Sequence, residues 1–219
     1  MIRNFQGMSL QSISIILISV LLTMSIHETA HGLVSYWLGD PTAKRAGRIS
    51  LNPFHHIDWY GLICLLLFGF GWAKPVPVDS SYYKDEKTGI IWTAFAGPVS
   101  NFLLAFVNIG IYCALVVFVP RFVFTGIGSY LLELLRYSAI LSAGFGIFNL
   151  IPIPPLDGSR IFWSFLPWQT YRKWMNPPAI IQIVLMLVIF SGLLSRPLGM
   201  MQSTVISWFV DFWSMVFIH

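Results

Sequence analysis

The segment HETAH, residues 27–31, combines the residue types of a metal site at a spacing that suits one. On a helix, His27 and His31 face the same side with their Cβ atoms about 5–6 Å apart. Two such imidazoles can bind one zinc ion, and Glu28, next to the first histidine, can reach a water bound to that ion. The simpler alternative is that the histidines only pack against a neighbouring helix, each with a hydrogen bond.

A catalytic zinc site needs a third protein ligand, and Asp157 is the candidate. It ends a long uncharged run, and Pro152, Pro154 and Pro155 before it cannot continue a regular helix. These prolines should hold the chain extended and carry Asp157 back along the end of the preceding helix. The alternative is an aspartate that starts a turn before Gly158.

His55 and His56 are further candidate ligands. They follow an Asn-Pro-Phe sequence in a polar stretch, which favours a structural role in a loop. Cys64 and Cys113 lie inside apolar runs without CxxC spacing, so the sequence indicates neither a thiol metal site nor a disulfide framework.

The composition is that of an integral membrane protein. Of the 219 residues, 56% are hydrophobic and 10% are charged, with a mean hydropathy of +0.73; soluble domains are about 25% charged. The length suits about five or six membrane spans of about 20 residues. The net charge of +4 does not indicate nucleic-acid binding, because the basic residues lie in loops beside apolar runs.

We therefore expect an all-α membrane domain over residues 1–219, with its core at about 8–160 and additional membrane helices at about 178–218. The apolar runs predict spans at Met8–Leu38, Ile90–Val119, Tyr137–Ile153, Pro178–Ser195 and, more weakly, Met200–Ile218. The shorter run Tyr60–Ala73 predicts a re-entrant or β-like segment between the first two core helices, or else a tilted full span.

Lysine and arginine are concentrated in the loop over residues 39–89 and in the loop after the third predicted span. The positive-inside rule places these loops in the cytoplasm. The HETAH motif then lies toward the cytoplasmic end of the first helix. The outer loop between the second and third spans is expected at residues 121–136.

Several motifs resemble the site-2 protease family of intramembrane zinc metallopeptidases. They occur in the family's order, on three successive predicted spans and the loops between them. The segments are HETAH, SLNPFHHID (residues 50–58), GWAKPVPVD (71–79), AGPVSN (96–101) and NLIPIPPLDG (149–158). The resemblance covers about residues 20–160 and is strongest to the small bacterial members. The predicted outer loop is too short for the PDZ domain that some relatives carry.

The resemblance implies that His27, His31 and Asp157 bind one zinc ion per chain and that Glu28 is the general base. Asn101 corresponds to a family residue that contacts the substrate backbone or the developing oxyanion. The alternative for Asn101 is a hydrogen bond between helices.

The function implied is a multipass zinc endopeptidase of the bacterial plasma membrane. It would cut membrane-spanning proteins near the cytoplasmic face, in regulated intramembrane proteolysis. Its partners would be the lipid bilayer and a transmembrane substrate, with a homo-oligomer or a regulatory membrane partner left open. The alternative is a non-catalytic scaffold, against which an intact Glu28 argues. A metal transporter ranks last, because the candidate ligands converge at one membrane depth.

The segment KPVPV, residues 74–78, alternates apolar residues with prolines, which is typical of an edge strand. One hypothesis is that it pairs with substrate by strand addition. The alternative is an ordinary cytoplasmic loop.

Overall fold

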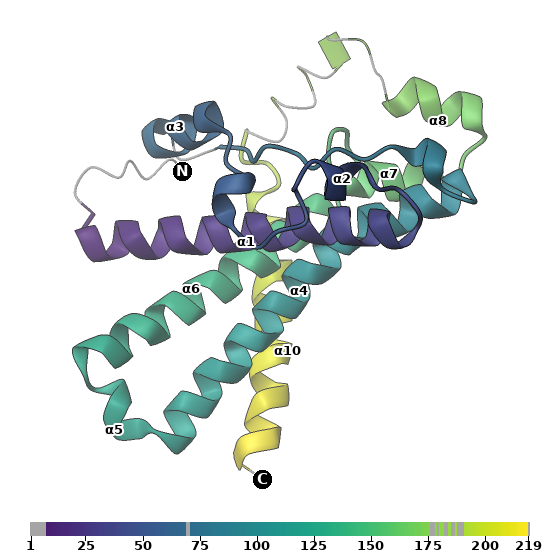
Figure 1. Ribbon diagram of the computed structural model, residues 1–219. Coiled ribbons are helices and arrows are strands. Elements are labelled where there is room, and N and C mark those ends of the chain that lie inside the picture. The colour runs from purple at the N-terminus through teal and green to yellow at the C-terminus, as the bar shows by residue number, and fades with distance from the viewer. Residues whose placement is uncertain are drawn as a thin grey trace.

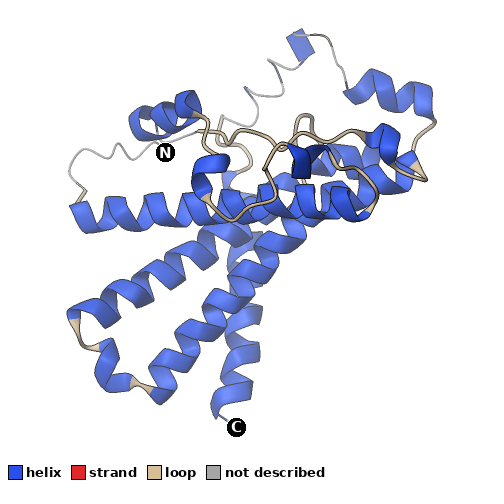
Figure 2. Ribbon diagram, viewed as in Figure 1, coloured by secondary structure: helices blue, strands red, loops and turns tan. Residues whose placement is uncertain are grey.

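The structure is a computed structural model that describes residues 8–68, 71–175, 178, 180, 181, 184, 187 and 191–218. The regular elements among the described residues are helices joined by loops, with one isolated bridge between Ile57 and Ala73 and no sheet (Figure 2). The elements are α1 (Leu10–Trp37), α2 (Thr42–Arg45), η1 (Pro53–His55), α3 (Trp59–Phe68), η2 (Ser80–Tyr82), α4 (Glu86–Phe118), α5 (Pro120–Val123), α6 (Gly126–Asn149), α7 (Asp157–Trp163), α8 (Trp168–Met175) and α10 (Ser195–Ile218).

Four of these helices, α1, α4, α6 and α10, are long and apolar enough to cross a membrane. They coincide with four of the predicted spans, which confirms the all-helical membrane class. The span predicted at 178–195 lies largely outside the described residues. A total of five or six spans therefore stays a prediction.

The boundary of α6 differs from the sequence prediction. The helix begins at Gly126 and not at Tyr137, so most of the predicted outer loop is helical. Thr125 starts it, because its Oγ1 accepts a hydrogen bond from the Gly128 N–H at 3.0 Å. The uncharged run begins only after Arg136, but an arginine near the end of a membrane helix can extend its charge to the interface, so the helix continues through it.

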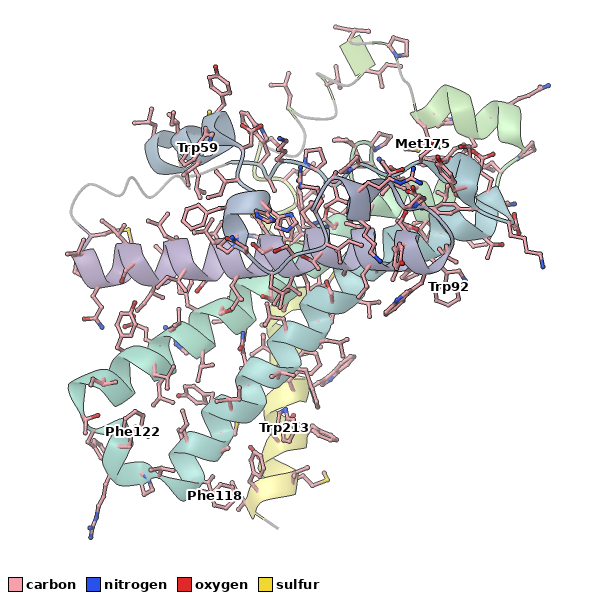
Figure 3. The ribbon with its side chains drawn as sticks, viewed as in Figure 1. Trp59, Trp92, Phe118, Phe122, Met175 and Trp213 are labelled. Carbon is pink, nitrogen blue, oxygen red and sulfur yellow. The ribbon has the colours of Figure 1, made fainter. Side chains whose placement is uncertain are left out.

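Helices α1, α4 and α6 pack against one another, and α10 packs on α4 and α6 (Figure 1). Small side chains let the helices approach closely. The core between α4 and α6 consists of Ala105, Ile109, Ala139 and Ala143. Figure 3 labels Trp213 on α10, beside α4. An added Cβ at Gly110 of α4 would lie 2.6 Å from the indole of Trp213. The indole N–H donates to the Phe106 carbonyl at 3.0 Å.

Polar side chains fix how these helices sit along one another. Thr23 of α1 and Ser142 of α6 are hydrogen-bonded through their hydroxyl groups at 2.8 Å. Asn108 of α4 donates to the Ser138 hydroxyl of α6 at 2.9 Å. Such bonds inside an apolar bundle contribute on the order of 1 kcal/mol each. They join α1 and α4 to α6, while contacts of His27 with Asn101 and of His31 with Thr93 place the second half of α1 opposite the first half of α4.

Helix α3 is too short to cross a membrane as described. Its 10 residues span about 15 Å at 1.5 Å per residue. The bridge between Ile57 and Ala73 closes the chain around it, and the Lys74 N–H donates to the His56 carbonyl at 2.9 Å. The predicted β-like segment is thus a single bridge. Whether this stretch re-enters the membrane or spans it stays a prediction.

Candidate metal centre

Helix α1 brings the two motif histidines together. Their Nε2 atoms are 3.0 Å apart, as the spacing of four residues predicts. His27 is buried and His31 is partly buried. The imidazole rings are nearly perpendicular, with an interplanar angle of 85°. Both rings therefore direct one nitrogen toward a common point.

Asp157 reaches the same point from α7. Its Oδ2 lies 3.1 Å from His27 Nε2 and 3.2 Å from His31 Nε2. Helix α6 ends at Asn149, and an irregular proline-containing turn leads back to Asp157. Gly158 permits the close return, because a Cβ there would lie 2.2 Å from the Leu150 carbonyl oxygen. The structure thus gathers the three candidate ligands that the sequence predicts.

The donor set fits a zinc ion. Ligand atoms about 2.0–2.1 Å from a tetrahedral zinc are about 3.3 Å from one another, close to the separations found here. His31 Nδ1 lies 2.7 Å from the Thr93 carbonyl oxygen, which can only accept. A neutral His31 therefore carries its proton on Nδ1, and its Nε2 presents a lone pair to a metal.

The carboxyl of Asp157 is suited to act as an anionic ligand. Its burial alone would oppose ionisation, but imidazoles of His27 and His31 that carry a proton on Nε2 donate to it and outweigh that effect. Together these contacts hold the pKa of Asp157 well below its ordinary value. The group is then ionised at neutral pH.

Asn101 of α4 is fully buried, with 0% exposure, and its Nδ2 lies 2.9 Å from His27 Nδ1. Its Oδ1 is buried and has no hydrogen-bond partner within the described residues. The contact is a hydrogen bond between α4 and α1, the alternative that the sequence left open. Asn101 is absent from the described lining of the cavity beside the histidines. Its expected contact with substrate stays a prediction.

Helices α1 and α4 touch at Gly97, directly beside the histidines. A Cβ at Gly97 would lie 2.4 Å from His31 Nε2 and 2.5 Å from His27 Cε1. Any side chain larger than hydrogen would therefore displace the two imidazoles. Pro98 follows within α4, where it removes one backbone donor from the helix.

Glu28 is oriented by the loop segment that follows α3. Its Oε2 accepts a hydrogen bond from the Val76 N–H at 2.8 Å. Pro75 and Pro77 have no N–H, so of these three consecutive residues Val76 alone supplies a backbone donor. The other carboxylate oxygen of Glu28 is then available toward the cavity.

Two buried charged side chains hold the segment over residues 74–79. Arg48 Nη2 donates to the carbonyl oxygens of Lys74 at 2.5 Å and Pro75 at 3.3 Å. At the other end, Asp40 Oδ2 accepts from the Asp79 N–H at 2.8 Å. The sequence showed Arg48 only as a loop charge and gave no signal for Asp40, because their partners are distant in the chain.

Asp40 is a buried carboxylate with several donors. Burial alone would raise the pKa of its carboxyl, but hydrogen bonds from Thr42, Asp79 and Ser35 outweigh this and lower it. Asp40 is therefore ionised and acts only as an acceptor.

An ionised Asp40 sets the direction of a hydrogen-bond chain that ends beside the metal site. The Ser35 hydroxyl donates to Asp40 at 2.8 Å, so it must accept from the Tyr83 hydroxyl, also at 2.8 Å. Tyr83 in turn accepts from the Thr93 hydroxyl at 3.0 Å. The carbonyl of the same Thr93 accepts from His31. This chain ties the start of α4 to the end of α1.

The candidate ligands and Glu28 open onto a cavity of about 310 Å³. Its walls come from α1, residues 71–78, α4, the end of α6 and α7. Its lining includes four residues that no sequence motif marks as functional: Thr93, Phe145, Asn149 and Arg160. His55 and His56 are outside it: His55 Nδ1 bonds to the Gly47 carbonyl at 3.0 Å, and His56 Nε2 to the Ser50 carbonyl at 2.7 Å. Both histidines have the predicted loop role.

Comparison with known proteins identifies the family. A model described as peptidase family M50 matches residues 125–195. The chain is 36% identical over 155 residues to "Putative zinc metalloprotease YwhC" of Bacillus subtilis, an alignment that covers 69% of each protein. The chain belongs to peptidase family M50. This confirms the resemblance to site-2 proteases and the expected classes of hydrolase, protease and metalloprotease.

Further relatives of this M50 protein cover more of its length. "Putative zinc metalloprotease MJ0611" of Methanocaldococcus jannaschii is 29% identical over 175 residues, which are 76% of this chain and 79% of the relative. "Putative zinc metalloprotease Rip2" of Mycolicibacterium smegmatis is 26% identical over 198 residues, 88% of this chain and 71% of the relative. No solved structure matches. The M50 family and the four apolar helices agree on a membrane protein.

Proposed function

We propose that this M50 protease is a zinc endopeptidase that hydrolyses membrane-spanning proteins near the cytoplasmic membrane face. One observation carries the proposal. Nε2 of His27, Nε2 of His31 and Oδ2 of Asp157 meet within 3.2 Å of one another, beside Glu28 and a cavity among apolar helices. Ionisable groups at such a depth are costly unless they serve a function.

The chain supplies the parts that peptide hydrolysis needs. A zinc ion held by the three ligands would make a water nucleophilic at neutral pH and polarise the scissile carbonyl. Glu28 would accept the proton of the attacking water and deliver it to the leaving amine. The Val76 N–H would keep one Glu28 oxygen fixed while the other receives the proton. Thr93 would hold the His31 ring in the tautomer that binds a metal.

Asn101 is a positioning residue in this proposal. A neutral His27 that binds zinc through Nε2 carries its proton on Nδ1 and needs an acceptor there. The Oδ1 atom of Asn101 is that acceptor once the amide turns by half a rotation, which also gives the buried Oδ1 a partner. Asn101 would then fix the ring of one ligand as Thr93 fixes the other.

Two substitutions of Asn101 separate this role from simple packing. Aspartate can accept from His27 Nδ1 but cannot donate, so Asn101→Asp should keep zinc affinity. Asn101→Leu, of similar size, removes the acceptor and should weaken zinc binding by about 10–100-fold, as loss of such a partner does elsewhere. Competition with a fluorescent zinc chelator measures both affinities. Equal affinities in the two variants would contradict the proposed role.

The substrate would run along the extended segment over residues 74–79. A transmembrane helix hides its carbonyls in its own hydrogen bonds, so it must unwind before cleavage. In an extended chain, Val76 and Val78 direct their backbone N–H groups to the same side. The Val76 N–H is taken by Glu28, whereas Val78 N–H makes no hydrogen bond within the described part of the chain. Val78 is therefore a place for strand addition beside the cavity.

Cleavage in a lipid bilayer tests the proposed function. Purified zinc-loaded protein would be reconstituted into liposomes with a panel of single-span model substrates, and the products identified by mass spectrometry. We expect cuts within or at the cytoplasmic end of the membrane segment by wild type and none by Glu28→Gln. Cuts confined to soluble regions would contradict the intramembrane substrate. No cleavage by the zinc-loaded wild type would favour the scaffold alternative.

A further inference from the structure

A second, smaller cavity adjoins the candidate active site. It has a volume of about 130 Å³ and lies between the start of α4, the η2 turn, α7 and α8. Its walls are Val78, Ser80, Tyr83, Ile90, Thr93, Arg160 and Tyr171. Val78, Thr93 and Arg160 also line the larger cavity. The two spaces therefore meet at these three residues, and we call the smaller one the side cavity.

Arg160 brings a charge to this junction. It lies on α7, three residues after Asp157, and its side chain is exposed. No carboxylate lies within ion-pair distance of it in the described part of the chain, where both ion pairs involve Asp157. Arginine has a permanent positive charge and a planar set of donors that matches a carboxylate. Its guanidinium therefore lacks the partner that its chemistry favours.

The neighbouring polar groups of the side cavity already have partners. The hydroxyl groups of Tyr83 and Thr93 are bonded to each other, and Tyr83 also bonds to Ser35. The Ser80 hydroxyl donates to Glu86 at 2.7 Å. A ligand in the side cavity would thus find Arg160 as its cationic partner, in a space that holds one short side chain.

We propose that the side cavity is a specificity subsite for an acidic side chain of the substrate, bound by Arg160. This inference rests on the proposed protease function. A substrate strand paired near Val78 would place alternate side chains on one face, at intervals of two residues. Val76 contacts Glu28, and Val78 borders both cavities. The acidic residue would therefore lie about two positions from the scissile bond.

Glu86 is the internal carboxylate that could compete for Arg160. It is exposed, its Oε1 accepts from Ser80, and both Glu86 and Arg160 act electrostatically on Tyr171. If Arg160 only balanced this charge, then removal of Glu86 would have the same effect as removal of Arg160. Glu86→Gln is therefore the matched control.

Peptide binding to the full-length Glu28→Gln protein, zinc-loaded in detergent, tests the subsite without cleavage. The probes are fluorescent, C-terminally amidated peptides of one apolar sequence, with a single glutamate or glutamine moved through successive positions. At one position we expect the glutamate peptide to bind about tenfold more tightly than its glutamine counterpart. Adding Arg160→Gln should abolish this preference, and adding Arg160→Glu should shift it to a lysine peptide. Adding Glu86→Gln should leave it unchanged.

The outcomes separate the subsite from the proposed function. Three results would overturn the subsite. The glutamate peptides could show no preference at any position, the preference could survive Arg160→Gln, or it could be lost equally in Glu86→Gln. If Arg160-dependent binding is seen only with peptides that have a free C-terminal carboxylate, the side cavity binds a chain terminus and not an acidic side chain, which also overturns the proposal. Zinc content and affinity for the glutamine peptides confirm that the variants are folded. If wild type binds these peptides and never cleaves any substrate, the proposed function fails, and the side cavity remains a binding site for an acidic side chain without a role in proteolysis.

Discussion

His31→Ala and Asp157→Ala should each purify with almost no zinc, whereas wild type and Glu28→Gln should carry about one zinc ion per chain. Removal of either ligand leaves two protein donors, fewer than the three that catalytic zinc sites use. His27 Nε2, His31 Nε2 and Asp157 Oδ2 are 3.0–3.2 Å apart, and alanine at position 31 or 157 supplies no ligand atom at that place. Elemental analysis against protein concentration measures the content, and it requires no substrate.

His55→Ala is the matched control for this experiment. His55 lies in the same region of the chain but bonds to the Gly47 carbonyl, outside the ligand group. It should retain zinc like wild type. Full zinc retention in Asp157→Ala would refute the third ligand. Absence of zinc from wild type, even after supply of the metal, would remove the basis of the hydrolytic proposal.

The second large effect concerns the general base. Glu28→Gln should lower the rate of substrate cleavage by about 10³-fold with zinc content unchanged, since a positioned base contributes about 10²–10⁴. Glutamine has nearly the same shape, and its amide oxygen can still accept from the Val76 N–H. It cannot accept the water proton at neutral pH. Initial rates of product formation, followed by mass spectrometry in liposomes, measure the difference.

Glu28→Asp gives a graded control for the same role. It keeps a carboxylate but withdraws it by one methylene from both Val76 and the cavity, so we expect a rate between those of wild type and Glu28→Gln. A Glu28→Gln rate within tenfold of wild type would show that another group takes the proton. Loss of zinc in Glu28→Gln would instead indicate that Glu28 binds the metal. In the structure the group of close ligand atoms comprises His27, His31 and Asp157 and does not include Glu28.

Much of the metal centre is predictable because its spacing is local. Four residues separate His27 from His31, and helix geometry alone then brings their side chains to one face. Asp157 could be proposed because prolines must end the preceding helix and return the chain. The long uncharged runs likewise predict the four membrane helices, since a bilayer requires about 20 apolar residues per span.

Elements whose sequence contains charged residues or prolines are harder to predict from the sequence. The sequence predicts the third span from Tyr137, whereas α6 begins at Gly126 after the N-cap Thr125. Glu133 and Arg136 interrupt the apolar run, so the first turns of the helix are not recognisable from hydropathy. The segment over residues 74–78 reads as a strand by its alternation, yet it forms none within the described chain. Arg48 and Asp40 form hydrogen bonds to the backbone near its two ends, and no local pattern encodes those contacts.

Composition predicts the membrane class, and the HETAH spacing together with the proline-containing return to Asp157 predicts the candidate ligands and the candidate base. The packed helices were needed to show that Asp157 meets the histidines, that Asn101 contacts His27, and that Arg160 lies between two cavities. Each of these contacts joins residues from different elements, so it depends on helix packing and on the small residues that permit close approach.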